Sequence, residues 1–299
     1  MVQQASTRSV FPPEIAAYMD VAVYVLDARA PLTTFHVERQ LAGERVFVLN
    51  KADLADPKET TRWRRCFASL GLEALPLSIR DAEGHRKLRD LLESHRLRKH
   101  AARALKVIRE TALRVVVLGV PNTGKSTLIN RLVGRRKAPT GSRPGLTRGY
   151  IWVRILDSVD LLDTPGVLRE YARLRKSKPR LLALGLIPED TRVLEAALDD
   201  VLSRLSEHNW RKFQQFYGVD SCVRELSSWE VAELVGRRSR GKTTEASLDD
   251  LGYRLLADFR QGRFGQVSLE TTAGQGDELA ALVARLRLSG ERLRKGAAP

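Results

Sequence analysis

The feature that most constrains the fold is the segment Gly119-Val-Pro-Asn-Thr-Gly-Lys-Ser126. It fits G-x-x-x-x-G-K-[ST], the pattern of a phosphate-binding P-loop. An apolar run over 114–118 precedes it and a helical pattern begins at Lys125, which is the strand–loop–helix context that the motif requires. Backbone N–H groups in such a loop surround phosphate oxygens, and the helix N-terminus adds partial positive charge. The sequence therefore predicts an α/β protein that binds a nucleoside phosphate.

The same loop supplies two side chains with specific chemistry. Lys125 would reach the β- and γ-phosphates as a catalytic group, and the Ser126 hydroxyl would bind Mg²⁺. The nucleotide contacts that we assign to the loop are Pro121, Asn122, Thr123, Gly124, Lys125, Ser126 and Thr127.

Two later segments fit the surroundings of a γ-phosphate. Asp163-Thr-Pro-Gly166 follows the apolar run 159–162, so Asp163 would join the Mg²⁺ shell. The Gly166 N–H would meet the γ-phosphate and sense hydrolysis, and we count it with Lys125 and Thr147 as catalytic. Thr147, in Pro144-Gly-Leu-Thr147, would bind Mg²⁺ when the γ-phosphate is present; an ordinary capping threonine is the alternative.

Asn50-Lys-Ala-Asp53 follows another apolar run, 46–49, and indicates the base. The Asp53 carboxylate can accept from both guanine N1–H and the N2 amino group, whereas adenine lacks these donors and would leave the carboxylate unpaired. Lys51 can lay its stem along the base. The motif is weak alone, because such turns are common in solvated loops, but beside a P-loop it predicts a guanine nucleotide.

Ser78-Ile79-Arg80 follows the run 75–77 and occupies the place of a base-edge loop, although a loop without this role is nearly as well supported. The order of the motifs is informative. Asn50–Asp53 and Ser78–Arg80 precede the P-loop, whereas an ordinary guanine-nucleotide domain has them after it. Chain termini that lie close in space permit such a rotation, so we predict a circularly permuted domain.

Strand and helix patterns alternate along the first 185 residues. The predicted strands are 21–26, 46–49, 75–77, 114–118, 150–156 and 159–162, and the predicted helices are 58–70, 85–108 and 125–133. Runs of β-branched residues and leucine separated by helices are typical of a mostly parallel, doubly wound sheet. We therefore predict an α/β fold with a circularly permuted P-loop domain over residues 1–185.

From residue 186 the pattern becomes helical, and we predict a small all-α domain over 186–299. Pro188 would open a long helical stretch that continues to Leu205. Ser227 with Glu230, and Ser247 with Asp250, have the spacing of capping boxes. One helical stripe comprises Leu248, Leu251, Leu255, Leu256 and Phe259, and core packing is its ordinary explanation. A last amphipathic helix is expected over 277–295.

The formal net charge of +15 is concentrated in the first part of the chain, where residues 1–185 carry +16 and residues 186–299 carry −1. Such a surplus favours a polyanionic partner, most simply nucleic acid, over a merely solvated surface. Two cysteines are too few for a cysteine-rich zinc site or a disulfide framework. We find neither a signal-peptide pattern nor an apolar run of about 20 residues, and we expect a cytoplasmic protein.

In this order, the motifs resemble those of the circularly permuted GTPases, and among them the ribosome biogenesis GTPase A family. The resemblance covers about residues 18–270 and is more specific before residue 186 than after it. The segments that carry it are Leu26-Asp-Ala-Arg-Ala-Pro31, Asn50-Lys-Ala-Asp-Leu54, Gly119–Thr127, Arg143-Pro-Gly-Leu-Thr147, Leu162-Asp-Thr-Pro-Gly166 and Asp258-Phe-Arg-Gln-Gly262 with Gly265.

The resemblance implies a GTP hydrolase that acts late in large-subunit assembly, with a C-terminal helical domain on rRNA. The implied cofactors are GTP or GDP and Mg²⁺, with K⁺ held by Asn122. The implied partners are the large ribosomal subunit and its rRNA, with no DNA, no membrane and a monomeric chain.

Two departures concern the hydrolytic water. Val167 follows Gly166 where Ras-like proteins carry glutamine, a substitution that the family shares. Family members are proposed to use a histidine in an N-terminal Phe-Pro-Gly-His-Met segment, but here that stretch reads Phe11-Pro-Pro-Glu-Ile15. His36 and Glu14 are weak substitutes, so the sequence identifies no side chain that positions the water, and we expect slow intrinsic turnover. A GTP-gated rRNA-binding factor with negligible hydrolysis is the alternative function.

Basic residues gather around the nucleotide motifs, and no acidic residue occurs between Glu110 and Asp157. Contact with RNA phosphates would weaken steeply with salt. The RNA-binding residues that we predict are Arg135, Arg136, Lys137, Arg143, Arg148, Arg173, Arg175, Lys176, Arg237, Arg238, Arg240 and Lys242.

Overall fold

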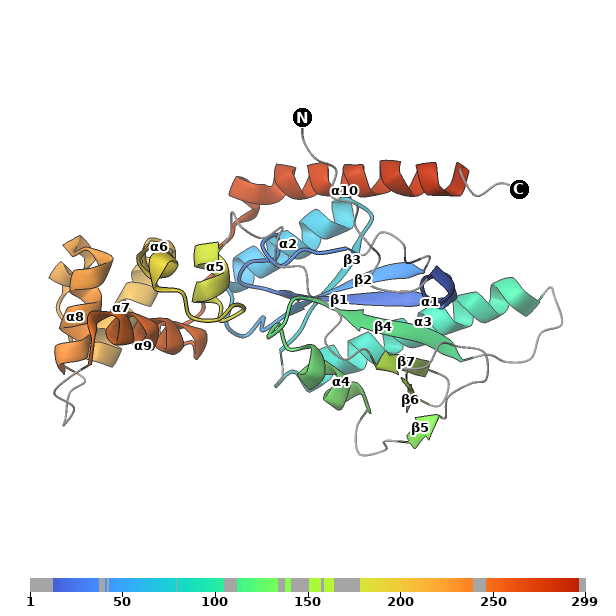
Figure 1. Cartoon of the computed structure of the whole chain (residues 1–299), viewed down its shortest axis with the longest axis horizontal. Coiled ribbons are helices and arrows are strands. Elements are labelled where there is room, and N and C mark those ends of the chain that lie inside the picture. Colours follow the sequence, from blue (N-terminus) through green and yellow to red (C-terminus); the bar gives the residue numbers. More distant parts are fainter. Residues whose placement is uncertain are drawn as a thin grey trace.

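The sheet and the helical bundle form two parts of the molecule (Figure 1). The fold is known from a computed structural model, which describes residues 13–37, 41, 43–78, 80–104, 112–133, 138–140, 151–156, 159–163, 178–238 and 246–295. The sheet and its flanking helices occupy one end of the long axis, and helices α6 to α9 occupy the other.

One seven-stranded sheet runs through the first part in the order β3-β2-β1-β4-β7-β6-β5. Its strands are β1 (Val21–Asp27), β2 (Glu44–Asn50), β3 (Glu73–Pro76), β4 (Leu113–Leu118), β5 (Ala138–Thr140), β6 (Ile151–Leu156) and β7 (Val159–Asp163). The pairings from β3 to β7 are parallel, and β6 is antiparallel to both of its neighbours. The six predicted strands and the mostly parallel α/β fold are confirmed. The three-residue β5 was not predicted, because so short a segment shows no periodicity.

Helices cover both faces of this sheet, as a doubly wound fold requires. They are α1 (Pro13–Tyr18), α2 (Pro57–Ser69), α3 (Ala82–Ala104), α4 (Lys125–Val133) and α10 (Thr272–Lys295). Alternate residues of β1 enter different cores, Val21, Val23 and Val25 on the α3–α4 side and Ala22, Tyr24 and Leu26 on the α1–α2–α10 side. The alternation is the period of two that a strand imposes, here with both faces apolar.

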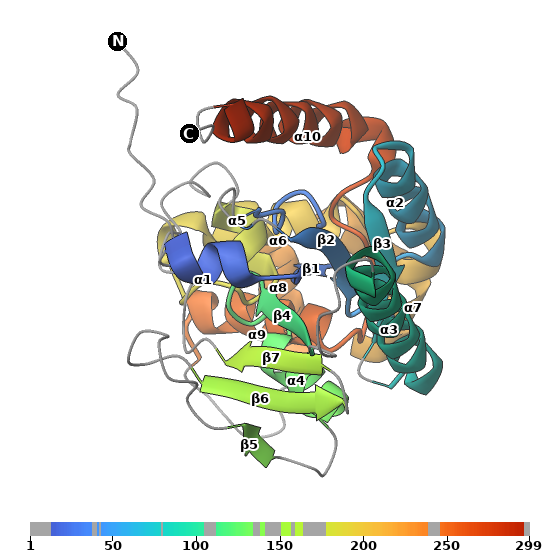
Figure 2. The same cartoon turned by 90° about the vertical axis from the view of Figure 1, so that its right-hand side faces the viewer.

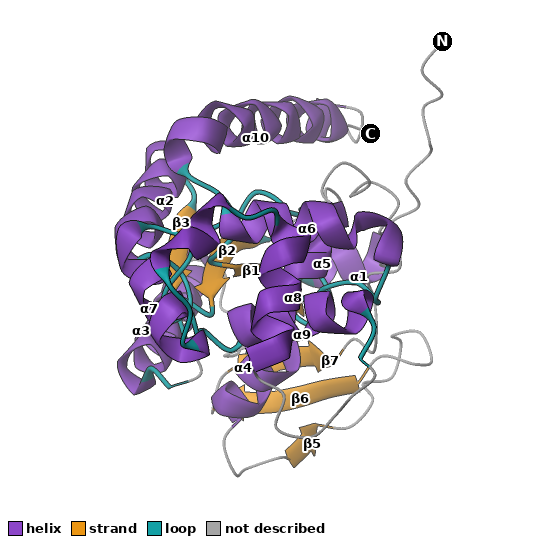
Figure 3. Cartoon of the chain, turned by 90° about the vertical axis from the view of Figure 1, so that its left-hand side faces the viewer, coloured by secondary structure: helices purple, strands orange, loops and turns teal. Residues whose placement is uncertain are grey.

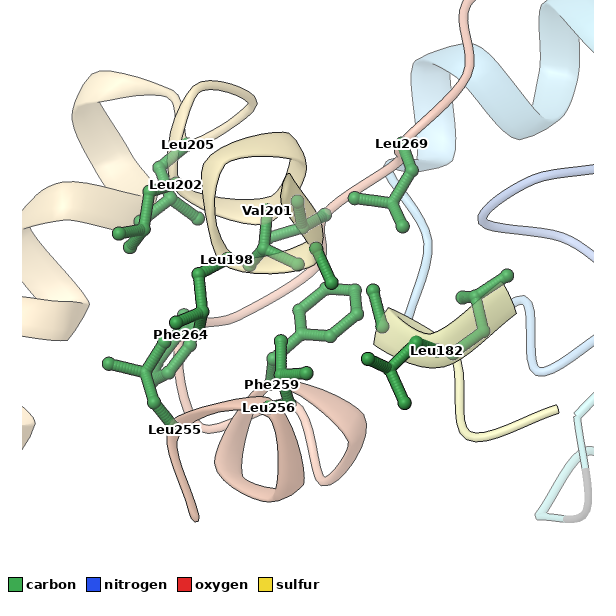
Figure 4. Close-up of a cluster of buried hydrophobic side chains, with 14 of the residues drawn as sticks. Leu182, Leu198, Val201, Leu202, Leu205, Leu255, Leu256, Phe259, Phe264 and Leu269 are labelled. Atoms are coloured by element: carbon green, nitrogen blue, oxygen red, sulfur yellow. The ribbon is translucent and has the colours of Figure 1, made fainter. Parts of the chain in front are cut away.

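The second part is a bundle of short helices that lies in front of the sheet when viewed along the long axis (Figure 3). Its helices are α5 (Lys178–Ala183), α6 (Leu194–Leu202), α7 (Glu207–Tyr217), α8 (Ser228–Arg238) and α9 (Leu248–Arg260), with 3₁₀ turns at Thr191–Val193 and Ser221–Glu225. Leucines of α5, α6 and α9 meet Phe259 and Phe264 in one apolar core (Figure 4). This core holds the bundle together by removing apolar surface from water.

The capping signals that begin α8 and α9 are confirmed. Ser227 and Glu230 exchange hydrogen bonds before α8, and Ser247 and Asp250 do so before α9. Within the predicted stripe only Leu248 is wrong, because it stands in the first turn of α9 and is 44% exposed.

The helix expected from Pro188 begins later. Asp190 caps a 3₁₀ turn instead, since its side chain accepts from the Arg192 N–H, and α6 starts at Leu194. Helix α7 was not predicted, because its polar and aromatic composition buries only Asn209 and Phe213.

Packing crosses the boundary expected at residue 185 in both directions. Helix α5 precedes that boundary, yet Leu181, Leu182 and Ala183 belong to the core of the bundle. Helix α10 follows it, yet Leu279 and Val283 pack with the α2 side of the sheet, where Figure 2 shows α10 beside α2. The division at 185 into two separate domains remains a proposal. The C-terminal helix α10 packs on the first part of the molecule.

Candidate nucleotide site

Three parallel strands deliver the predicted nucleotide motifs to one edge of the sheet. Strand β4 ends at Leu118 before the P-loop, and β2 ends at Asn50, the first residue of Asn50–Asp53. Strand β1 lies between them and pairs with both. Because ligands of open α/β sheets bind at the carboxyl ends of the strands, this edge is the candidate site.

The P-loop requires glycine where it approaches its neighbours. Gly119 has φ of 154°, and a Cβ there would lie 2.5 Å from the Val25 carbonyl oxygen. Gly124 has φ of 97°, and a Cβ there would lie 2.2 Å from Nδ2 of Asn50. Both positions exclude a side chain, so the glycines of the motif let the loop pack against β1 and the Asn50 turn.

The two motifs, about 70 residues apart in the chain, are joined directly. Asn50 donates from Nδ2 to the Thr123 carbonyl at 2.7 Å, and Lys51 donates from Nζ to the Asn122 carbonyl at 3.0 Å. Lys51 and Asn122 both have left-handed backbones, with φ of 58° and 62°. Left-handed non-glycine residues are costly and often mark functional sites. The base motif and the phosphate loop are therefore built as one unit.

Side chains within the P-loop bond to the loop itself. Lys125 donates from Nζ to the Val120 carbonyl at 2.9 Å, and the buried Thr123 hydroxyl donates to the same carbonyl at 2.7 Å. Burial lowers the pKa of Lys125 from its ordinary value. A phosphate would supply the negative charge that this half-buried ammonium lacks in its present bond to a neutral carbonyl.

The segment that returns from the bundle contacts the base motif, which the sequence did not predict. Gln266 donates from Nε2 to the Asp53 carbonyl at 3.3 Å, and the Val267 N–H donates to the Leu54 carbonyl at 3.0 Å. The Asp56 N–H donates to Ser268 Oγ at 3.0 Å. The only sequence signal nearby was the Asp258–Gly265 segment of the family resemblance, and it did not reveal this contact.

The P-loop also contacts the bundle. Asn122 donates from Nδ2 to the Gly185 carbonyl, just after α5, at 3.1 Å. A cavity of about 950 Å³ adjoins this contact, lined by Pro121, Asn122 and residues around 186–192. The phosphate end of the site therefore borders the bundle as well.

Some of the remaining predicted residues lie in the described part of the chain, and the others lie outside it. Ser78 is buried just after β3, Arg80 lies in the turn before α3, and Ser126 is exposed in the first turn of α4. Asp163 is the last residue of β7, and Arg237 and Arg238 end α8. His36 is half-buried, and Glu14 lies in α1. The predicted residues outside the described part are Ile79, Thr147, Gly166, Arg135, Arg136, Lys137, Arg143, Arg148, Arg173, Arg175, Lys176, Arg240 and Lys242.

The described ranges contain neither a membrane-spanning helix nor a cluster of metal-ligating side chains. No helix within them is long and apolar enough to cross a membrane. No three side chains of His, Cys, Asp or Glu in that part of the chain come together as ligands for a metal ion.

Comparisons with known proteins agree with the fold. A family model described as "50S ribosome-binding GTPase" matches residues 114–213. Ribosome biogenesis GTPase A of Thermotoga maritima is 30% identical over 86% of this chain and 88% of its own length. The Bacillus cereus protein of the same name is 28% identical, over 87% of this chain and 89% of its own length.

The crystal structure of GNP-bound YlqF from T. maritima is also similar, with a TM-score of 0.56, 28% identity, and coverage of 84% of this chain and 92% of that one. A GDP-bound structure of T. maritima YlqF has a TM-score of 0.55 and 27% identity. The fold and the loop after β4 define a P-loop nucleotide-binding protein in which the base motif after β2 precedes the P-loop in the chain. This chain belongs to the ribosome biogenesis GTPase A family and is a GTPase.

Proposed function

We propose that this protein binds GTP at the P-loop and at Asn50–Asp53, hydrolyses it to GDP and phosphate, and acts as a switch in late assembly of the large ribosomal subunit. The observation that carries the proposal is the contact between the two motifs. Asn50 and Lys51 bond to carbonyls of the P-loop, so a base at one motif and phosphates at the other lie within the span of one nucleotide. The relatives' name supplies the ribosomal setting.

The base is selected by Asp53. Its carboxylate accepts from both guanine donors, and the backbone carbonyls of Asp53 and Leu54 accept from Gln266 and Val267. The Asp53 side chain is exposed, and adenine would cover its carboxylate without offering it a donor, so adenine is rejected. Ser78, Ile79 and Arg80 complete the base edge.

The phosphates are bound by the P-loop backbone and Lys125. Mg²⁺ would be held by Ser126, Thr147 and Asp163, all oxygen donors, which suit this cation. Ser126 is exposed at the start of α4, and Asp163 ends a strand paired with β4, so both belong to the same edge of the sheet. A K⁺ ion would be held by Oδ1 of Asn122, the acceptor atom of that amide, while Nδ2 donates to the Gly185 carbonyl.

The two candidate functions differ in the rate of GTP hydrolysis. Gly166 would sense the γ-phosphate, but no glutamine follows it, and residues 11–15 contain no histidine. We therefore propose slow intrinsic hydrolysis that ribosomal subunits stimulate. The absence of that histidine also favours a second candidate, a GTP-gated rRNA-binding factor with negligible hydrolysis.

The proposed partner is rRNA of the large subunit, which the chain would bind as a monomer in the cytoplasm. The +16 charge of residues 1–185 supports this partner, because lysine and arginine side chains neutralise RNA phosphates. In the sequence, the predicted contacts around 135–148 and 173–176 flank the nucleotide motifs, and those at 237–242 begin with the last two residues of α8. We further propose that nucleotide state reorients the bundle.

Sedimentation with separated ribosomal subunits tests this function. The chain should pellet with large subunits in a non-hydrolysable GTP analogue, should be released in GDP, and should ignore small subunits. Equal pelleting in both nucleotides, or preference for small subunits, would contradict the assignment.

Single-turnover hydrolysis with and without large subunits separates the two candidate functions. Stimulation by subunits supports the GTPase switch, whereas the same very slow rate in both conditions supports the GTP-gated binding factor. A fast basal rate that ignores subunits and K⁺ would contradict both.

A further inference from the structure

A buried carboxylate lies behind the base motif. Asp27 ends β1, pairs in register with Asn50, and has no exposed surface. Its carboxylate accepts from Arg29 through Nε at 2.9 Å and Nη2 at 2.8 Å. On the same side, Oδ2 lies 3.1 Å from Nζ of Lys51.

Lys51 therefore has two anionic or dipolar partners from different segments. Its ammonium contacts the Asp27 carboxylate at 3.1 Å and the Asn122 carbonyl of the P-loop at 3.0 Å. Its side chain is 25% exposed, so one side of the ammonium is fixed while the stem remains at the surface. A lysine with four carbons and several rotamers needs such partners to hold one position.

We propose that Asp27 is a positioning residue for guanine-nucleotide binding: it fixes the ammonium of Lys51 on the P-loop carbonyl and so sets the distance between the base motif and the phosphate loop. This inference rests on the proposed function, because it takes Lys51 as part of the base site. Asp27 itself touches no nucleotide in this account.

The electrostatics of the buried cluster explain why a carboxylate is required. Burial alone would raise the pKa of Asp27, but the charges of Arg29 and Lys51 hold that pKa well below its ordinary range. Asp27 therefore remains ionised and balances two cations. An amide of the same shape keeps the volume but leaves Arg29, which is 1% exposed, without its counter-charge. The Lys51 ammonium then loses the carboxylate that holds it in one position.

The opposite end of β1 provides a matched control. Asp20 is also paired with one arginine and one lysine, Arg114 at 3.1 Å and Lys99 at 2.5 Å. The parallel extends to aromatic neighbours, because Arg114 lies over the Tyr18 ring and Arg29 lies over the Phe259 ring. The two carboxylates differ in that Asp20 stands at the N-terminal end of the strand, away from the nucleotide motifs.

The test is the affinity for a fluorescent GDP derivative in four variants of the full chain: Asp27→Asn, Lys51→Met, the double variant, and Asp20→Asn. We expect Asp27→Asn and Lys51→Met each to weaken binding about tenfold, since each removes a hydrogen bond of a charged group. The double variant should match Lys51→Met, because Asp27 acts through Lys51. Asp20→Asn should bind within about twofold of the wild type although it also loses a carboxylate with two cationic partners.

Each contrary outcome has a defined meaning. GDP binding in Asp27→Asn equal to that in Asp20→Asn would overturn the inference, as would losses that add in the double variant. If circular dichroism shows that Asp27→Asn does not fold, Asp27→Asn combined with Arg29→Gln takes its place, because both members of the buried ion pair are then neutral. GDP binding in that variant equal to that in Arg29→Gln alone would likewise overturn the inference. Failure of the wild type to bind GDP would instead reject the proposed function.

Discussion

The two halves of the nucleotide site are held in different ways. In the base half, Asn50, Lys51 and Asp53 are bonded to segments far away in the sequence: β1, the P-loop and residues 266–268. In the phosphate half, Lys125 bonds to a carbonyl five residues before it in the same loop. Long-range contacts fix a geometry before ligand arrives, whereas the short-range contact of Lys125 is one that a phosphate oxygen can replace.

The two halves of the site therefore have different roles. The base half is preorganised, so its cost of ordering is met during folding, and it should confer affinity and selectivity. The phosphate half has a half-buried ammonium and a bond from Asn122 to the bundle at Gly185, so it is the half that can respond to the nucleotide.

The largest effect is expected in the phosphate half. Lys125→Ala should lower the hydrolysis rate about a hundredfold to a thousandfold, because it removes the cation that stabilises charge on the transferring phosphoryl group. Single-turnover assays with labelled GTP measure this. Lys87→Ala is the control, since Lys87 is an exposed lysine paired with Glu83 on α3, and it should hydrolyse GTP like the wild type. Equal rates in the two variants would remove Lys125 from the mechanism.

Selectivity should respond to the base half. Asp53→Asn should weaken GDP binding by about a hundredfold, because two charge-assisted hydrogen bonds are lost. It should improve binding of xanthosine diphosphate, whose C2 oxygen can accept from the new amide. Competition of both nucleotides against a fluorescent derivative measures the exchange, and an unchanged order of preference would place the base elsewhere.

Lowering the pH should remove part of the stability that the charge of Asp27 gives to the base half. The pKa of Asp27 is lowered in the folded protein, so the stability that its charge contributes is present above the unfolded value, about 3.9, and is lost as the pH falls below it. The difference in unfolding free energy between the wild type and Asp27→Asn should be constant from pH 7 to 5 and narrow by up to about 1 kcal/mol at pH 3.5. Urea titrations at each pH measure it, and a gap that widens would refute the assignment.

The smallest effect concerns the segment that returns from the bundle. Gln266→Ala should raise the GDP dissociation rate only about twofold, because one neutral hydrogen bond to the Asp53 carbonyl is lost. Gln261→Ala is the matched control, since the Gln261 side chain bonds to Arg263 and not to the base motif. Stopped-flow release of fluorescent GDP distinguishes them, and identical rates would show that the returning segment does not steady Asp53.

Most of the fold could be predicted from local pattern. The apolar runs of β1, β2 and β4 are long enough to identify buried strands, and serine with an acidic residue three positions later marks the starts of α8 and α9. Helix α7 escaped because its buried face is small and partly polar, with Asn209 donating to the Phe264 carbonyl. The packing of α5 and α10 across residue 185 could not be predicted, since burial partners are not visible in a single segment.

The site was predictable where one segment carries the chemistry. The P-loop and Asn50–Asp53 are contiguous motifs, and their order gave the permutation. The roles of Asp27 and Gln266 depend on contacts between segments that lie 24 or more residues apart. No periodicity or spacing encodes such a contact, so only the structure brings these residues to the base motif.

The central claim is that Asn50–Asp53 and the P-loop are joined into one guanine-nucleotide site whose base half is preorganised. Competition of unlabelled GDP and ADP against a fluorescent GDP derivative on the wild-type chain tests it most directly. GDP should displace the probe at stoichiometric concentration, and ADP should fail to displace it even at about a thousandfold excess, because adenine would leave the Asp53 carboxylate unpaired. Displacement by ADP and GDP at similar concentrations would contradict it.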